Sequence, residues 1–220
     1  MKYGHELLGF LSELRENNNK EWFENNRNRY QILRNSFTET MINLHSSLLT
    51  FDNGLENIDA KGSLFRINRD IRFSKDKSPY KNNFGSYFSE GGKKIELAGY
   101  YVHIQPQNSF VGGGLYMPQP ADLKKIRQEI DYHQEEFLQI VNQVDFKKYF
   151  SEIQGEKLKN TPKEYEKNHV LAEYLKLKGY FVVAKLSDEE VCDANFLNHI
   201  VTIFRAMYPL NLFLNRSIRN

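Results

Sequence analysis

The sequence predicts an α+β fold, with a central antiparallel sheet, packed helices, a long N-terminal helix and a helical C-terminus. Apolar residues recur at intervals of three and four over residues 20–49 and 120–141, which is the spacing of a helix with one buried face. Between these segments, residues 64–117 alternate apolar and polar side chains and contain short connections, which favours an antiparallel meander. We expect a single domain, with a helical part (1–50), a mostly stranded part (64–117) and a mixed, mainly helical part (120–220).

The composition indicates a globular protein of the cytoplasm. Of the 220 residues, 40% are hydrophobic and 14% aromatic, which is enough for a buried core. No apolar run approaches the roughly 20 residues that span a bilayer, and residues 1–10 lack the profile of a signal peptide, so no membrane partner is expected. The single cysteine, Cys192, excludes an internal disulfide and a metal site of several thiolates.

The N-terminal part is predicted to contain two helices. Residues 5–16 carry leucines at helical spacing, and the three asparagines at 17–19 end this helix because asparagine favours turns and caps. The second helix is expected from Lys20 to Leu49, a rod of about 45 Å at 1.5 Å per residue. Residues 51–62, rich in Asp, Asn and Gly, are expected to form a loop.

The central part is predicted to supply most of the strands. Residues 64–73 fit either a strand or a helical turn, and we favour the strand because Phe65, Ile67, Ile71 and Phe73 would then share one face. The other expected strands are Phe84–Ser89 and Lys94–Ala98 around a turn at Gly91 and Gly92, then Tyr100–Gln105 and Phe110–Met117.

The C-terminal part is predicted to be mainly helical, with one further strand. A helix over residues 120–141 is followed by an irregular stretch to residue 167 and a short helix at 169–177. A strand is expected at Tyr180–Leu186. Ser187 and Glu190 fit a capping box, after which a helix is expected. A second helical face, marked by Phe196 to Phe204, is expected to end before Pro209, and the tail to residue 220 is a candidate for a final helix.

Positive charge is concentrated in residues 61–81. This segment holds seven basic residues and two acidic ones, so its net charge is 7 − 2 = +5, whereas the whole chain carries only +2. A local basic patch on a nearly neutral protein indicates one particular anion as a partner. The charged residues are Lys61, Arg66, Arg69, Asp70, Arg72, Lys75, Asp76, Lys77 and Lys81.

The same segment resembles the signature of a known family. Its pattern is Arg66-x-x-Arg69-Asp70-x-Arg72-Phe73, followed by Asp76-Lys77-x-x-Tyr80, and it is similar to that of a family of bacterial conserved hypothetical proteins, catalogued as a domain of unknown function. Other stretches look similar too, at Trp22–Phe23, 110–115, 162–165 and 175–178. Glu164 stands where that family commonly has glycine. The resemblance would cover nearly the whole chain, but it implies no activity, substrate or cofactor.

The basic cluster is the main candidate for a functional site. Arginine offers a planar fork of donors to a phosphate or carboxylate, and lysine adds a point charge. On a strand, Arg66 and Arg72 would face a ligand, with Lys77, Tyr80 and Lys81 beside them. Arg69 would point to the other face and need an acid, for which Asp76 is one candidate because Asp70 faces away. The alternative is a structural network of ion pairs.

Two further positions join the candidate ligand-binding residues. Gly113 lies in a run of three glycines whose missing side chains would open a pocket, although a close approach to another backbone explains the run better. His103 lies on the expected central strand. The six histidines are scattered without a metal-binding spacing, so no metal site is predicted.

Three classes of function follow from this pattern. The first is binding of a small anionic ligand, with or without its turnover. The second, less favoured, is binding of RNA or DNA, because the chain is only +2 overall and lacks recognised nucleic-acid-binding motifs. The third is a structural or protein-interaction role, in which the cluster only holds the fold together.

Overall fold

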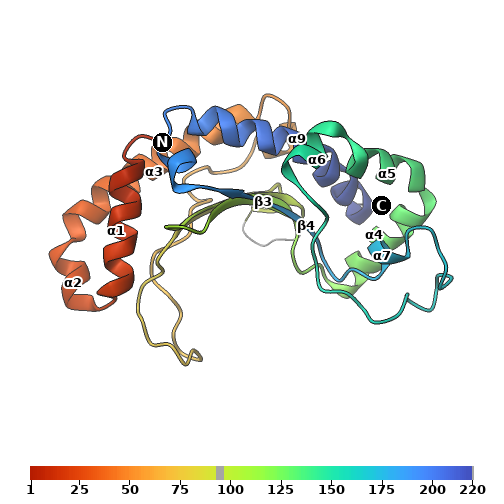
Figure 1. The fold of residues 1–220 in the computed structure, drawn as a ribbon, viewed down its shortest axis with the longest axis horizontal. Coiled ribbons are helices and arrows are strands. Elements are labelled where there is room, and N and C mark those ends of the chain that lie inside the picture. The colour runs from red at the N-terminus through yellow and green to blue at the C-terminus, as the bar shows by residue number, and fades with distance from the viewer. Residues whose placement is uncertain (93–96, 220) are drawn as a thin grey trace. The chain divides into compact units, whose positions relative to one another are not determined.

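The computed structural model describes residues 1–92 and 97–219 and confirms the α+β fold. The described strands form one open antiparallel sheet with the order β1-β2-β3-β4, so each strand pairs with its neighbour in sequence (Figure 1). The strands are β1 (Phe84–Phe88), β2 (Gly99–Ile104), β3 (Ser109–Leu115) and β4 (Tyr180–Leu186). These bounds agree with the predicted strands to within two residues.

The chain divides into two compact units, which are described separately. The first unit comprises residues 1–88, 101–111 and 185–201, and the second comprises residues 89–100, 112–184 and 202–220. The helices of the first unit are α1 (Gly4–Glu16), α2 (Lys20–Asn25), α3 (Arg27–Leu48), the short η1 (Asn53–Leu55) and α8 (Asp188–Cys192). Those of the second are α4 (Pro120–Tyr132), α5 (Gln134–Asn142), α6 (Val144–Tyr149) and α7 (Ala172–Leu175). Helix α9 (Phe196–Arg219) begins in the first unit and ends in the second.

The long helix predicted for residues 20–49 is wrong in one respect, because it is broken at Asn26. This residue has φ −105° and ψ 11°, and its side-chain Nδ2 donates to the carbonyl of Trp22 at 2.9 Å. Such a side-chain bond competes with the helical hydrogen bond of the backbone, which is why asparagine interrupts helices. The chain therefore turns between α2 and α3.

Helix α3 covers the inner face of the sheet within the first unit. The ring of Phe37 lies 5.4 Å from that of Phe84, and the burial along β2 alternates as predicted. Val102 and Ile104 are fully buried, whereas Tyr101 and His103 are half-buried. Successive side chains of a strand point to opposite faces, so Tyr101 and His103 lie on the outer face, away from α3.

The strand predicted for residues 64–73 is wrong as a continuous element. The segment makes two isolated antiparallel bridges, Leu64 with Ser86 and Asn68 with Tyr80. The amide of Arg69 donates to the carbonyl of Pro79 at 2.9 Å, but Pro79 has no N–H to return, so the ladder stops there. Phe73, expected on the buried face, is 97% exposed.

The predicted turn at Gly91 and Gly92 is present. The amide of Gly92 donates to the carbonyl of Ser89 at 2.7 Å, and Gly92 has φ +63°, a conformation that favours glycine. The strand predicted at Lys94–Ala98 lies mostly outside the described residues, and its described end, residues 97 and 98, is not a strand.

The second unit departs from the sequence prediction in two helices. The helix expected over residues 120–141 is two helices, because His133, with φ −119° and ψ 47°, closes α4 and begins α5. The turn directs Phe137 toward Phe213 of α9, with 5.4 Å between the ring centroids. The stretch up to residue 167 that was expected to be irregular also contains a short helix, α6.

Helix α9 continues through Pro209, where an end was predicted. Proline removes one helical hydrogen bond and costs about 3 kcal/mol in a helix interior. The helix nevertheless keeps a buried apolar stripe on both sides of Pro209, at Phe204, Met207, Leu210, Phe213 and Leu214, all at most 1% exposed. Burial of this stripe outweighs the local cost of proline. In the described part of the chain, no helix is both long and apolar enough to cross a membrane.

Candidate functional site

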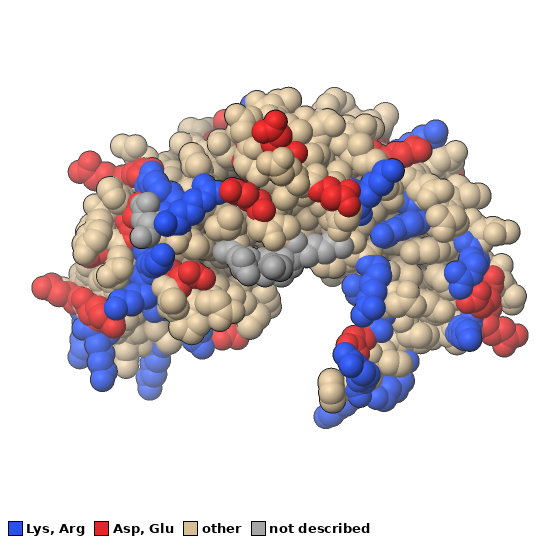
Figure 2. Space-filling model, turned by 180° about the vertical axis from the view of Figure 1, so that it is seen from behind, with Lys and Arg blue, Asp and Glu red and all other residues tan. Residues whose placement is uncertain are grey.

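The segment before β1 carries the predicted cluster as a loop of the first unit, held at both ends. At its start, Nη1 of Arg34 on α3 donates to the carbonyl of Phe65 at 2.8 Å. At its end, the side-chain amide of Asn18 bonds both backbone groups of Tyr80. Lys and Arg side chains gather on this projecting segment, with acidic side chains between them (Figure 2). The loop is thus fixed to α3 and to the turn after α1.

Arg69 is held in one orientation by three acceptors. Its Nη1 forms the predicted ion pair with Asp76 and donates to the carbonyl of Ser78 at 3.1 Å, while Nη2 lies 3.4 Å from Oγ of Ser74. Hydrogen bonds from Ser78, followed by the guanidinium of Arg69, lower the pKa of Asp76 to about 2. The carboxylate is therefore charged at neutral pH and fixes the arginine.

Asp70, Arg72 and Lys77 of the signature lie in the exposed part of the loop, here called its tip. Nε and Nη2 of Arg72 donate to the two oxygens of Asp70, at 3.0 and 2.7 Å, and this hydrogen bonding, assisted by the charge of Arg66, lowers the pKa of Asp70. Lys77 Nζ donates to the carbonyl of Ile71 at 3.0 Å. The tip is therefore tied together largely by its own side chains.

Tyr80 is a packing residue in this structure. Its ring stacks on Phe23 of α2, with 4.0 Å between centroids and an interplanar angle of 16°, and the residue is 6% exposed. Burial, followed by the negative charge of Glu24, raises the pKa of its hydroxyl. The signature tyrosine thus anchors the loop to α2.

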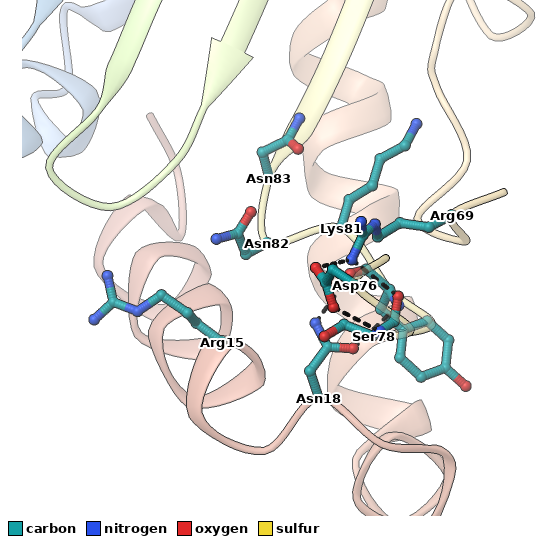
Figure 3. Close-up of a pocket in the computed structure, with 9 residues that line it drawn as sticks. Arg15, Asn18, Arg69, Asp76, Ser78, Lys81, Asn82 and Asn83 are labelled. Atoms are coloured by element: carbon teal, nitrogen blue, oxygen red, sulfur yellow. Dashed lines mark hydrogen bonds and ion pairs between the residues drawn. The ribbon is translucent and has the colours of Figure 1, made fainter. Parts of the chain in front are cut away.

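An open pocket of about 510 Å³ lies beside the Arg69–Asp76 pair (Figure 3). It brings together four of the predicted site residues and leaves Arg66, Asp70, Arg72 and Lys77 outside its lining. Its lining residues are Arg15, Asn18, Arg69, Asp76, Ser78, Tyr80, Lys81, Asn82 and Asn83. Apart from the ring of Tyr80, the side chains that line the pocket are charged or carry amide or hydroxyl groups.

Sequence reasoning missed the residues that complete this pocket. Arg15 and Asn18 belong to the end of α1 and the turn after it, which no local pattern connects to residues 66–81. Asn82 and Asn83 directly follow Lys81, so their position next to the signature could have identified them as candidate site residues. Asn18 belongs to a run of three asparagines, and its neighbours have local roles, since Asn17 bonds the carbonyl of Glu13 and Asn19 caps α2.

His103 lies on the outer face of β2, where Asn83 connects it to the pocket. Nδ2 of Asn83 is 3.4 Å from Nδ1 of His103, which also lies 2.9 Å from the hydroxyl of Tyr101. Nε2 of His103 lies 2.9 Å from Oε1 of Gln105. Burial lowers the pKa of the imidazole, so His103 is neutral, with its proton on Nε2 facing the Gln105 oxygen.

Gly113 lies in the second unit, at a position where the backbone of Gly99 and the side chain of Met207 come close to it. A Cβ at this position would overlap the carbonyl oxygen of Gly99 and the sulfur of Met207. The close backbone approach considered for the glycine run is therefore present, and Gly113 is not among the residues that line the pocket. Among residues 1–92 and 97–219, no group of three or more His, Cys, Asp or Glu side chains is placed to hold a metal ion.

Comparison with known proteins identifies the family. No curated protein and no solved structure matches the chain. The family model described as "Conserved hypothetical protein (DUF2461)" matches residues 6–213, which include the loop, the pocket and the whole sheet. The match covers nearly all of the 220 residues, in agreement with the resemblance of the signature segment. The chain therefore belongs to the DUF2461 family of conserved hypothetical proteins.

Proposed function

We propose that the protein binds a small anionic ligand, through a phosphate or carboxylate group, in the pocket beside Arg69. The observation that carries this proposal is the charge of the lining. The lining contains three basic residues, Arg15, Arg69 and Lys81, and one acid, Asp76, so its net charge is 3 − 1 = +2. Side-chain amides of Asn82 and Asn83 add neutral hydrogen-bond donors beside these charges.

Arg69 is suited to receive the anion because its orientation is already fixed. Nη1 is occupied by Asp76 and the Ser78 carbonyl, but Nε has no hydrogen-bond partner among the residues that the structure describes. The edge formed by Nε and Nη2 is one of the two-donor edges with which arginine holds a phosphate or carboxylate. A side chain ordered in advance loses little conformational freedom when the ligand binds.

Lys81 and Arg15 supply the remaining positive charge. Arg15 pairs with its neighbour Glu16 at 3.1 Å, but both side chains are more than half exposed, and such surface pairs contribute little. Arg15 is therefore able to turn toward a ligand at small cost. We place this binding in the cytoplasm, which the low cysteine content favours.

The experiment is a thermal melt and a calorimetric titration with inorganic phosphate and with citrate. A ligand at ten times its Kd should stabilise the protein by about 1.4 kcal/mol and raise Tm by about 3–6 °C. Lys81→Met and Arg15→Met should lose most of this shift. Arg72→Met is the matched control, because Arg72 belongs to the same loop and signature but lies outside the pocket lining.

Three results would contradict the proposal. One is a Tm that no anion changes, and another is an equal loss of binding in Arg72→Met. The third is tight binding of duplex DNA whose affinity falls with salt at a slope near −0.9 for each phosphate neutralised, which would indicate nucleic acid as the partner.

A further inference from the structure

The outer face of the sheet beside the pocket carries a group of half-buried rings. Phe65, Tyr101, His103 and Phe110 all belong to the first unit. The Phe65 and Tyr101 centroids are 6.1 Å apart, and those of Tyr101 and Phe110 are 5.6 Å apart. His103 stacks on Phe110 at 4.6 Å with an interplanar angle of 15°. We call these four residues the ring platform.

The backbone leaves room for this platform at Gly85 of β1. A Cβ at Gly85 would lie 3.1 Å from the hydroxyl oxygen of Tyr101, which is tighter than an ordinary contact. The absent side chain therefore lets Tyr101 lie across the neighbouring strand. Rings on the open face of a sheet offer flat apolar surfaces on which the base of a nucleotide stacks.

Two residues connect the ring platform to the anion pocket. Lys81 lines the pocket, and its Nζ lies 5.4 Å from the centroid of the Phe65 ring. Asn83 also lines the pocket, and its amide nitrogen lies 3.4 Å from Nδ1 of His103. A molecule whose anionic group contacts Lys81 and Asn83 would therefore have its remaining atoms next to the rings.

The platform is neutral and has polar groups at its edge. Burial raises the pKa of Tyr101 and lowers that of His103, so both groups are uncharged at neutral pH. The side-chain amide of Gln105 contacts His103, and that of Asn108 contacts Gln105, with 3.4 Å between Asn108 Nδ2 and Gln105 Oε1. A flat heteroaromatic ring with donors and acceptors on its edge matches this combination, and a bare inorganic anion uses none of it.

From this arrangement we infer that the ligand is a small phosphorylated heteroaromatic molecule of the nucleoside monophosphate class. Its phosphate occupies the pocket at Arg69 and Lys81, and its base lies on the ring platform at Phe110 and Tyr101. The inference rests on the proposed function, because it takes the anion pocket as the phosphate site, and it adds the ring platform as the specificity-determining half.

The test is isothermal titration with the four ribonucleoside 5′-monophosphates and with ribose 5-phosphate, which has the sugar and phosphate but no base. Stacking of one base contributes about 1–3 kcal/mol, so at least one nucleotide should bind about fivefold or more tightly than ribose 5-phosphate. Phe110→Leu, which keeps an apolar side chain but removes the ring, should abolish this advantage and leave the Kd of ribose 5-phosphate unchanged.

Two further variants separate the two halves of the site. Lys81→Met should weaken nucleotide and ribose 5-phosphate alike, because both share the phosphate. Phe73→Ala is the matched control: it removes a ring that is 97% exposed at the loop tip, and nucleotide affinity should stay at the wild-type value. A melt of each variant without ligand shows whether Phe110→Leu remains folded, and Tyr101→Leu provides a second test of the platform.

The outcomes distinguish failure of the ring platform from failure of the anion pocket. Equal affinity for nucleotides and ribose 5-phosphate would overturn the ring platform and leave the anion site standing. Binding of neither would overturn the ring platform and the phosphate form of the anion site, and the titration with citrate then tests the carboxylate form. Nucleotide binding that survives Phe110→Leu and Tyr101→Leu would also overturn the platform. Single-stranded RNA that binds far more tightly than any mononucleotide would overturn the small-molecule class.

Discussion

The side-chain amide of Asn18 bonds both backbone groups of Tyr80, 62 residues away in sequence. Nδ2 of Asn18 donates to the Tyr80 carbonyl at 2.9 Å, and Oδ1 of Asn18 accepts from the Tyr80 amide at 3.0 Å. A carboxamide presents one donor and one acceptor side by side, as a peptide group of a neighbouring strand does. Asn18 thus satisfies the N–H and C=O groups of Tyr80 that point away from its bridge partner Asn68.

The first prediction is that Asn18→Ala loosens the loop. The substitution leaves both backbone groups of Tyr80 without these bonds, and each such bond contributes about 1 kcal/mol. We expect Tm to fall by about 4–8 °C and hydrogen exchange at the Tyr80 amide to accelerate. Asn17→Ala is the control, because its side chain bonds only the exposed end of α1. Unchanged exchange at Tyr80 would show that Asn18 does not hold the loop.

The second prediction is that Arg69 and Arg72 differ in their effect on stability. The Arg69 side chain is 26% exposed and has three acceptors, whereas Arg72 is 76% exposed and pairs only within the tip. Exposed pairs contribute little, so Arg72→Ala should melt within about 1 °C of the wild type. Arg69→Ala should lower Tm by about 2–4 °C. Equal effects in chemical or thermal denaturation would mean that the tip is as structural as the base of the loop.

The third prediction concerns acid pH. The pKa of Asp76 is lowered from 3.8 to about 2 in the folded protein, first by Ser78 and then by Arg69. Its contribution to stability is therefore fully present above about pH 4 and is lost as the pH falls toward 2. The Tm difference between wild type and Asp76→Asn should be constant from pH 5 to 7 and shrink below pH 4. An NMR titration of the Asp76 carboxyl carbon with a midpoint near 4 would contradict this.

The strands and most helices were predictable because their apolar spacing is local. The pattern over Tyr100–Gln105 gives the two faces of β2 directly, and Ser187 with Glu190 gives the cap of α8, which has both bonds of a capping box. The breaks at Asn26 and His133 were missed because one polar residue in a periodic stretch is usually tolerated. Pro209 was misread for the opposite reason, since packing on both sides of it overrides a local rule.

The site was predictable only in part, because a loop brings together residues without a common pattern. The need of Arg69 for an acid followed from the cost of leaving a partly buried guanidinium unpaired, and Asp76, one candidate from the sequence, is its partner. Arg15 and Asn18 could not be found this way, because their nearness to Lys81 depends on how α1 packs against α3. The position of Tyr80 on Phe23 has the same origin, since it depends on the turn between α1 and α2.

The last prediction compares two glycines with opposite expected effects. A Cβ at Gly113 of β3 would overlap the Gly99 carbonyl oxygen, which also accepts from Asn211 at 3.0 Å, and the Met207 sulfur. Because backbone atoms cannot move aside as a flexible side chain does, Gly113→Ala should destabilise the protein by about 1–3 kcal/mol. At Gly9, inside α1, a Cβ would meet only Nη2 of Arg29 at 3.7 Å, an ordinary contact.

Gly9→Ala should therefore stabilise the protein by about 0.5–1 kcal/mol, since alanine restricts the unfolded chain and favours the helix. The measurement is the free energy of unfolding in urea for both variants. If Gly113→Ala unfolded at the wild-type urea concentration, the close approach of β3 to Gly99 would be refuted. If Gly113→Ala kept its stability but changed ligand affinity, Gly113 would belong to a binding site, which was the less favoured interpretation of the glycine run.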